Sequence, residues 1–195
     1  MFEASALGRV LAAVADVLSA GGHGWYVFGA QAVLAYGRPR LTADLDITVM
    51  ADLAHAPELI ARMRAAGLAL QQVATDDFVR RTRVLPFVHE ATGMPVDIIL
   101  AGPGLEEEFV ANARELALAG VMVPVISPED LVVTKILAGR PKDGDDVDGI
   151  LREQLPSLDL DRCRRFLRML EEALSRDDLL PKLDEALART RSRQA

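Results

Sequence analysis

The chain lacks the features that build secreted or membrane-spanning proteins. It has one cysteine, Cys163, so no internal disulfide can form, and a reducing compartment is expected. It has no uncharged apolar stretch of the roughly 20 residues that a bilayer requires. Its first residues also lack the basic start of a signal peptide. We therefore expect a cytoplasmic protein that does not contact a membrane.

Excess positive charge is also missing. The formal net charge is −7, which weighs against non-specific binding along a nucleic acid, because that binding depends on cations that neutralise phosphates. A local basic pocket is still compatible with this charge. Half of the 195 residues are apolar, so the chain can bury a core and disorder is not expected.

Apolar periodicity and turn residues predict the order of the elements. In the first third we expect a helix ending at Gly21-Gly22, a strand at 25–28, a helix at 30–36, a strand at 41–50 and a helix at 57–66. The middle is expected to contain strands at 68–73, 79–88 and 96–100, a helix at 105–116 and a strand at 121–126. Ser127 and Pro128 then form a strong helix start, and only helices are expected beyond them.

This order predicts an α+β protein in two parts. Residues 1–126 are expected to form a core with a mixed β-sheet flanked by helices, and residues 127–195 a C-terminal helical region.

Three aspartates carry the strongest chemical signal. Asp44 and Asp46 are two residues apart in a predicted strand, so their carboxylates should project from the same face. Asp97 lies in a later, otherwise apolar strand, where an acid needs a partner. Ionised carboxylates held close together repel one another unless a cation lies between them. Such hard oxygen ligands suit Mg²⁺, which commonly binds a phosphate oxygen as well.

Simpler interpretations exist for each acid taken alone. Asp44 and Asp46 could be strand-end residues that point into solvent, and Asp97 could be a partly buried acid with a satisfied hydrogen bond. A glycine turn after one strand, paired acids on a second and a lone acid on a third form a more specific combination than any one of these features.

At this point the sequence resembles a known group of proteins. It carries Phe28-Gly29-Ala30-Gln31-Ala32, followed by Arg40-x-Thr42-x-Asp44-x-Asp46. These motifs are similar to the signature of the polymerase-β-type nucleotidyltransferase superfamily. Within it, the likeness is closest to the AbiEii-like toxin nucleotidyltransferases and the small aminoglycoside and lincosamide nucleotidyltransferases. The resemblance covers roughly residues 24–146 and implies the nucleotidyltransferase fold.

The resemblance implies a role for each matching residue. Asp44, Asp46 and Asp97 would be the catalytic and metal-binding residues, holding two Mg²⁺ ions together with a bound nucleoside triphosphate. The nucleotide-binding residues would include the glycine turn and the basic motif, which are Gly29, Ala30, Arg40 and Thr42. The family often has Gly-Ser or Gly-Gly at this turn, so Ala30 removes a hydroxyl that could donate to phosphate.

A second cluster downstream also matches the family. Lys135 matches a lysine that reaches the triphosphate, and Lys142, Asp143 and Asp146 match residues that line the nucleotide cleft in the toxin-like relatives. The alternatives are an ordinary surface lysine and a solvated acidic loop in which Asp143 caps a helix.

These expectations combine into a Mg²⁺-dependent nucleotidyltransferase that moves a nucleoside monophosphate from a nucleoside triphosphate to an acceptor hydroxyl and releases pyrophosphate. A tRNA end, a protein hydroxyl and a small molecule are all compatible as acceptors. The rival hypothesis is a catalytically silent nucleotide- or partner-binding module of a toxin–antitoxin type system, with a cognate antitoxin-like protein as its partner.

Overall fold

The structure, a computed structural model, describes residues 5–37 and 44–194. The elements up to the middle of the chain are α1 (Ala6–Ala20), β1 (Trp25–Phe28), α2 (Gly29–Tyr36), β2 (Leu45–Met50), η1 (Leu53–His55), α3 (Ala56–Ala65), β3 (Leu68–Leu70), α4 (Asp76–Thr82) and β4 (Val84–His89). The remaining elements are β5 (Pro95–Ala101), α5 (Leu105–Ala111), β6 (Arg114–Leu118), β7 (Val121–Val125), α6 (Pro128–Ala138), α7 (Pro141–Gln154), η2 (Leu155–Ser157), α8 (Leu160–Leu174) and α9 (Leu179–Gln194).

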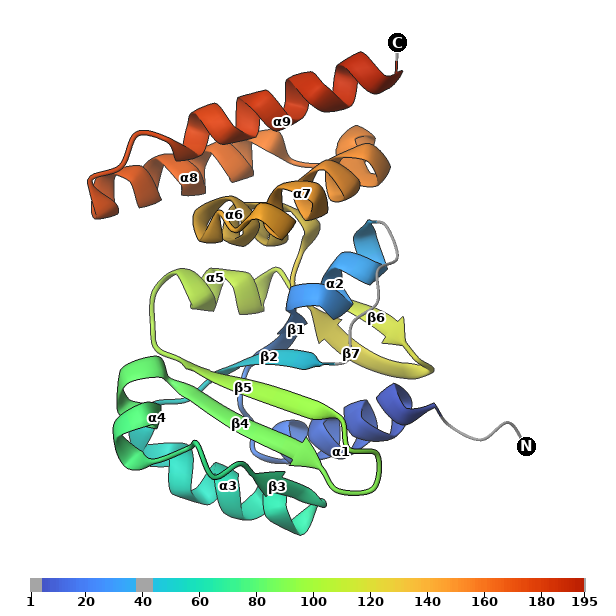
Figure 1. The fold of residues 1–195 in the computed structure, drawn as a ribbon, viewed down its shortest axis with the longest axis vertical. Helices are drawn as coiled ribbons and strands as arrows, with labels where there is room; N and C mark the ends of the chain where they lie inside the picture. The colour runs from blue at the N-terminus through green and yellow to red at the C-terminus, as the bar shows by residue number, and fades with distance from the viewer. Residues whose placement is uncertain (1–4, 38–43, 195) are drawn as a thin grey trace. The chain divides into compact units, whose positions relative to one another are not determined.

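The strands of the described residues form one mixed seven-stranded sheet in the order β3-β4-β5-β2-β1-β7-β6. The β2–β5 and β1–β7 pairs are parallel, and the other neighbours are antiparallel. The central strands β2, β1 and β5 contribute to the core, and Leu45, Val27 and Ile98 have no exposed surface. Helices α1 and α3 lie side by side along the sheet (Figure 1). The expected α+β class, with a flanked mixed sheet and a helical C-terminal region, is confirmed.

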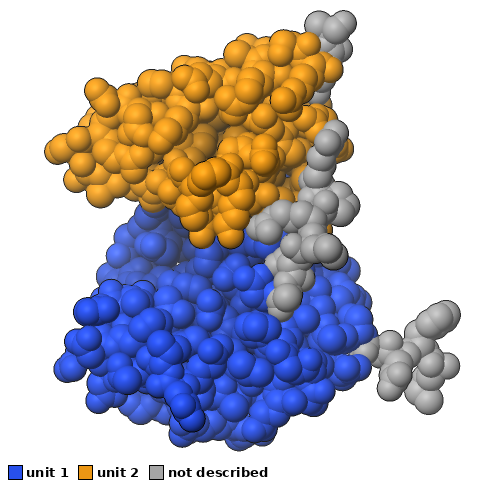
Figure 2. Space-filling view, viewed as in Figure 1, with its two compact units in different colours: residues 1–31, 41–126 blue, residues 32–40, 127–195 orange. Residues whose placement is uncertain are grey.

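The chain divides into two compact units (Figure 2). Unit 1 consists of residues 1–31 and 41–126 and contains the sheet. Unit 2 consists of residues 32–40 and 127–195 and contains helices α6 to α9. Helix α2 begins in unit 1 and continues into unit 2. Among the described residues, no helix combines the length and apolar character that crossing a bilayer would require.

The strand expected at 79–88 is wrong in its first half. Residues 76–82 form helix α4, and strand β4 begins only at Val84. The Thr75 side chain caps the helix by accepting a hydrogen bond from the Phe78 N–H at 3.2 Å, and Arg83 ends it in the left-handed conformation with φ 59°. The sequence contains these helix signals, a capping hydroxyl followed by two acids, but the β-branched and aromatic residues that follow outweighed them.

Two further boundaries differ from expectation. The helix expected at 105–116 ends at Ala111, and Leu116 lies in the edge strand β6. Strand β6 forms a hairpin with β7 through Ala119 and Gly120, whose φ angles of 49° and 86° are those of a tight hairpin turn. Strand β3 is also shorter than expected and stops at Leu70.

Candidate functional site

Two of the three predicted acids lie on adjacent strands at the centre of the sheet. Asp46 on β2 pairs in parallel register with Asp97 on β5. Residues directly opposite each other on paired strands project from the same face, about 5 Å apart. Their neighbours along each strand are fully buried, whereas both aspartates are only partly buried. The alternation of the strands therefore directs the two carboxylates away from the packed interior.

Asp44 lies close enough to act electrostatically on Asp97. Burial raises the pKa of Asp97, and the negative charge of Asp44 raises it further. Asp44 itself is exposed, just before β2 begins at Leu45. The arrangement is therefore one in which negative charge accumulates, and a cation would lower its energy.

The chemistry of this group fits Mg²⁺. Asp46 and Asp97, paired on adjacent strands, can supply hard oxygen donors of the kind that Mg²⁺ prefers. No three acid, histidine or cysteine side chains in the described part of the chain are arranged to hold a metal ion by themselves. Mg²⁺ is usually bound by one or two carboxylates together with water and substrate phosphate, so a closed protein cage is not required.

Gly29 opens α2 immediately after β1 and packs against the Asp46 carboxylate. Its φ of 64° lies in the left-handed region, which glycine adopts at no steric cost. A Cβ at this position would overlap the Asp46 carboxylate, with Cγ only 2.8 Å away. Ala30 follows and is buried. The first turn of α2 contains no acid, so the partial positive charge at its N-terminus faces Asp46 without competition from the helix itself.

One polar residue of this turn was quoted in the motif but given no role from the sequence. Gln31 is 5% exposed, and its side-chain Nε2 donates to the backbone carbonyl of Asp44 at 3.2 Å. The sequence shows only a glutamine two residues after the glycine turn. Its burial and its partner, 13 residues away, could be identified only in the structure. Arg40 and Thr42, also predicted to bind nucleotide, lie outside the described residues.

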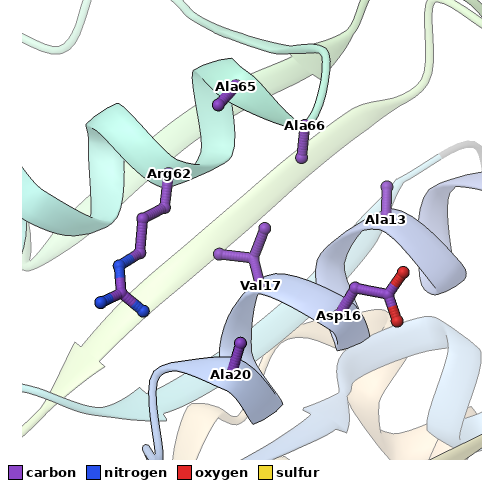
Figure 3. A pocket seen from close by; sticks show the side chains of 7 residues that line it. All are labelled: Ala13, Asp16, Val17, Ala20, Arg62, Ala65 and Ala66. Carbon is purple, nitrogen blue, oxygen red and sulfur yellow. The ribbon is translucent and has the colours of Figure 1, made fainter.

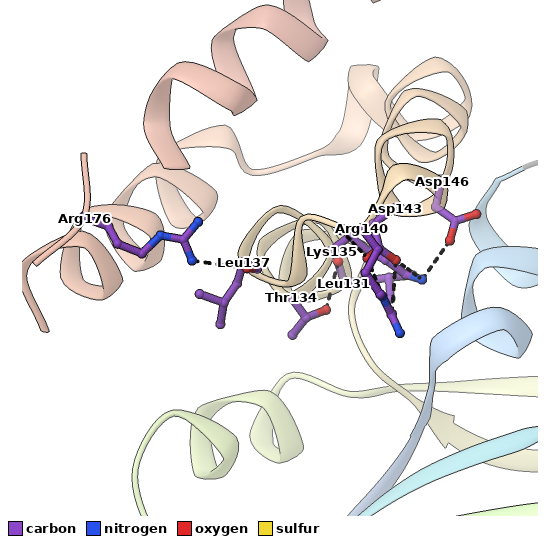
Figure 4. A network of polar contacts seen from close by, with 8 residues as sticks. All are labelled: Leu131, Thr134, Lys135, Leu137, Arg140, Asp143, Asp146 and Arg176. Atoms are coloured by element: carbon purple, nitrogen blue, oxygen red, sulfur yellow. Dashed lines mark hydrogen bonds and ion pairs between the residues drawn. The ribbon is translucent and has the colours of Figure 1, made fainter. Parts of the chain in front are cut away.

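In unit 2, Lys135 lies within a buried ionic network (Figure 4). Its Nζ contacts Asp143 Oδ1 at 3.2 Å and Asp146 Oδ2 at 2.7 Å, and all three side chains are almost fully buried. Arg140 donates to Asp143 through Nε at 2.7 Å and through its backbone N–H at 3.1 Å. The structure therefore brings Lys135, Asp143 and Asp146 together.

The electrostatics of this network favour the ionised form of Asp143. Burial alone would raise the pKa of Asp143, but hydrogen bonds from Arg140 and Lys135 outweigh it and hold that pKa below the ordinary value. The surface-lysine interpretation is wrong, because Lys135 is buried, and Asp143 is buried as well instead of lying in a solvated loop. Helix α7 begins at Pro141, so Asp143 lies in its first turn, where its carboxylate accepts the Arg140 N–H as part of a capping box.

A cavity of about 230 Å³ opens beside the network in unit 2. Lys135, Arg140 and Asp143 line one side, and Lys182, Glu185 and Arg189 on α9 line the other. Lys142, the fourth predicted residue of this segment, is exposed and does not line the cavity.

A second groove, in unit 1, is separate from the acids. It has a volume of about 600 Å³ and lies between α1 and α3 (Figure 3). Its lining is mostly alanine, with Val17, Asp16 and Arg62, and none of the predicted site residues contributes to it.

Comparisons with known proteins identify the fold. Residues 100–183, less than half of the chain, match a family described as nucleotidyl transferases of unknown function (DUF2204). No curated protein sequence matches the chain. The solution structure of the antibiotic-resistance factor ANT(2'')-Ia is similar, with 17% identity, a TM-score of 0.56 and coverage of 85% of this chain and 93% of that one.

Two crystal structures show the same likeness. The lincosamide antibiotic adenylyltransferase LnuA, solved with lincomycin, has 15% identity and a TM-score of 0.51, over 73% of this chain and 94% of that one. An antigenic nucleotidyltransferase-like protein from Paracoccidioides brasiliensis has 18% identity and a TM-score of 0.53, over 90% and 91% of the two chains. The chain therefore has the nucleotidyltransferase fold that the resemblance of its motifs implies.

Proposed function

We propose that this protein is a Mg²⁺-dependent nucleotidyltransferase that transfers a nucleoside monophosphate from a nucleoside triphosphate to an acceptor hydroxyl. The observation that carries the proposal is the pairing of Asp46 with Asp97 on adjacent parallel strands, next to the N-terminus of α2 at Gly29. Carboxylates and a helix start are the groups that hold a metal–triphosphate, because the acids bind the cation and the backbone N–H groups bind phosphate.

In this proposal Asp44, Asp46 and Asp97 would hold two Mg²⁺ ions with the bound nucleotide. Bound there, the ions would supply positive charge at the attacking and leaving oxygens. The new bond joins the acceptor oxygen to the α-phosphorus, the α–β phosphoanhydride bond breaks, and pyrophosphate leaves with its electron pair. Asp97 would take the proton of the acceptor hydroxyl, or would poise the metal that lowers the pKa of that hydroxyl.

The proposal includes Lys135, Lys142, Asp143 and Asp146 as nucleotide-binding residues. The ammonium of Lys135 would act as a point charge toward phosphate, and its contacts with two aspartates hold it in place. Arg40 and Thr42 complete the predicted nucleotide-binding set. The acceptor classes to be screened are a tRNA end, a protein hydroxyl and a small molecule. The structural likeness to an adenylyltransferase solved with lincomycin makes hydroxylated small molecules the first class to try.

Two observations favour a second candidate, a silent nucleotide- or partner-binding module that works with an antitoxin-like protein. The turn has the apolar Ala30 where relatives often carry serine, and the Lys135 ammonium is already engaged by two carboxylates. Such a module would bind nucleotide without releasing pyrophosphate.

Calorimetry with each of the four nucleoside triphosphates, with and without Mg²⁺, tests the proposal. Wild type should bind at least one of them only with Mg²⁺, and Asp44→Asn/Asp46→Asn should lose that binding. The matched control is Asp76→Asn/Asp77→Asn, which removes two exposed carboxylates in the first turn of α4. Binding that the control retains, followed by pyrophosphate release when an acceptor is supplied, supports the enzyme. Binding without Mg²⁺ dependence would exclude the metal assignment.

A further inference from the structure

Gln31 makes a buried contact with the candidate metal site. Its side chain is 5% exposed, on the first turn of α2, and its Nε2 donates to the main-chain carbonyl of Asp44 at 3.2 Å. A primary amide removed from water must be hydrogen-bonded, otherwise its burial costs free energy. Its hydrogen-bond partner is the backbone carbonyl of Asp44, one of the three candidate metal ligands.

That carbonyl lies just outside the regular sheet. The paired register of β2 and β5 begins at Leu45, one residue after Asp44, and continues through Asp46 and Asp97. Strand-pairing hydrogen bonds therefore hold the backbone at Asp46 and Asp97. At Asp44, which precedes the paired register, the Gln31 side chain supplies a hydrogen bond to the backbone.

The first turn of α2 contacts both Asp44 and Asp46, one through its main chain and the other through its side chain. Gly29 packs against the Asp46 carboxylate, and Gln31 bonds the Asp44 main chain two residues further along the helix. The separation between the two carboxylates therefore depends on how this turn is placed against the start of β2.

We propose that Gln31 is a positioning residue, which holds the Asp44 carboxylate at the spacing from Asp46 that a bound divalent cation needs. This inference rests on the proposed function. Gln31 would not touch the cation itself; it would act through the Asp44 backbone, as residues that orient metal ligands do. Loss of such an orienting group commonly weakens metal binding by about tenfold or more.

The test measures Mn²⁺ affinity, because Mn²⁺ replaces Mg²⁺ at oxygen sites and its free concentration is read directly by electron paramagnetic resonance. Mn²⁺ is titrated together with each of the four α,β-methylene nucleoside triphosphates, which cannot transfer the nucleotide. Gln31→Met keeps the length of the side chain but cannot donate. Gln31→Asn keeps the amide but is one methylene too short, and it serves if the methionine variant does not fold.

Gln71 provides a matched control. Its Nε2 also donates to a main-chain carbonyl, that of Phe87, at the same distance of 3.2 Å, within unit 1, and that carbonyl belongs to none of the three acids. Gln71→Met therefore removes an equivalent hydrogen bond at a position with no proposed role. Thermal unfolding of all variants is recorded in parallel, so that a loss of metal affinity is separated from a loss of stability.

About tenfold weaker Mn²⁺ binding in both Gln31 variants, with wild-type affinity in Gln71→Met, is the expected result. If wild type binds Mn²⁺ and the Gln31 variants bind within twofold of it, or if the control loses as much, the positioning role is overturned while the proposed function stands. If wild type binds no Mn²⁺ with any of the analogues, the proposed function fails and this inference fails with it.

Discussion

Replacing Asp97 with asparagine should stabilise the metal-free protein and abolish the stabilisation that metal and nucleotide provide. Burial, and then the charge of Asp44, raise the pKa of Asp97 above its ordinary value of 3.8. The folded state therefore holds this proton more tightly than the unfolded state. As pH rises from 3.8 through the raised pKa, folding stability falls, and above it the whole cost of the buried charge is present.

The magnitude follows from Coulomb's law for the Asp44 charge that acts on Asp97. Two carboxylates roughly 6 Å apart repel each other by about 0.7 kcal/mol at the permittivity of water and about 3 kcal/mol at an effective value of 20. We expect Asp97→Asn to gain about 1 kcal/mol, since the site is partly exposed. For a chain of this length, that corresponds to an increase in Tm of about 2–4 °C.

The assay is thermal unfolding at pH 8 in two conditions. In EDTA, Asp97→Asn should melt above wild type. With Mg²⁺ and an α,β-methylene nucleoside triphosphate at about 100 times Kd, wild type should gain about 2.7 kcal/mol and the variant little, so the order reverses. Asp77→Asn, an exposed acid in a weak pair with Arg81 at 3.7 Å, should change little in either condition. A variant that melts below wild type in EDTA would refute the charge argument.

Three other predictions concern single residues. Gly29→Ala should cost roughly 1–3 kcal/mol, because the left-handed backbone and the overlap with Asp46 both oppose a Cβ; chemical denaturation measures it. Arg162→Met should cost about 3–5 kcal/mol in the same assay, because it leaves the fully buried Asp130 without its partner at 2.9 Å. Cys163, whose pKa burial raises to about 12, should resist alkylation at pH 8 until the protein unfolds.

Each of these has its own control. Gly22→Ala places a Cβ at another left-handed glycine where no atom lies within 4 Å, so any excess loss at Gly29 reports the overlap with the acid. Arg164→Met removes an exposed pair with Asp184 and should cost less than about 1 kcal/mol. Alkylation of the native thiol at the rate of free cysteine would contradict the buried environment of Cys163.

Local patterns were sufficient for much of the fold. The helix start at Ser127 and Pro128 is confirmed, because a capping hydroxyl and a proline act within one turn of chain. The same reasoning failed at residues 79–83, where helix signals and strand-forming residues overlap, and at Leu116, where pairing with β7 decided the conformation. Strand pairing depends on partners that local spacing does not reveal.

For the site, the sequence by itself determined which residue types were available: paired acids two positions apart, a later acid in an apolar strand and a glycine turn. Only the tertiary structure decided that Asp46 pairs with Asp97 and that Gln31 reaches the main chain of Asp44. It also decided that Lys135 is buried between two aspartates instead of exposed. The physical reason is that side-chain chemistry is encoded locally, whereas register, burial and the partner of a buried polar group are set by contacts between distant segments.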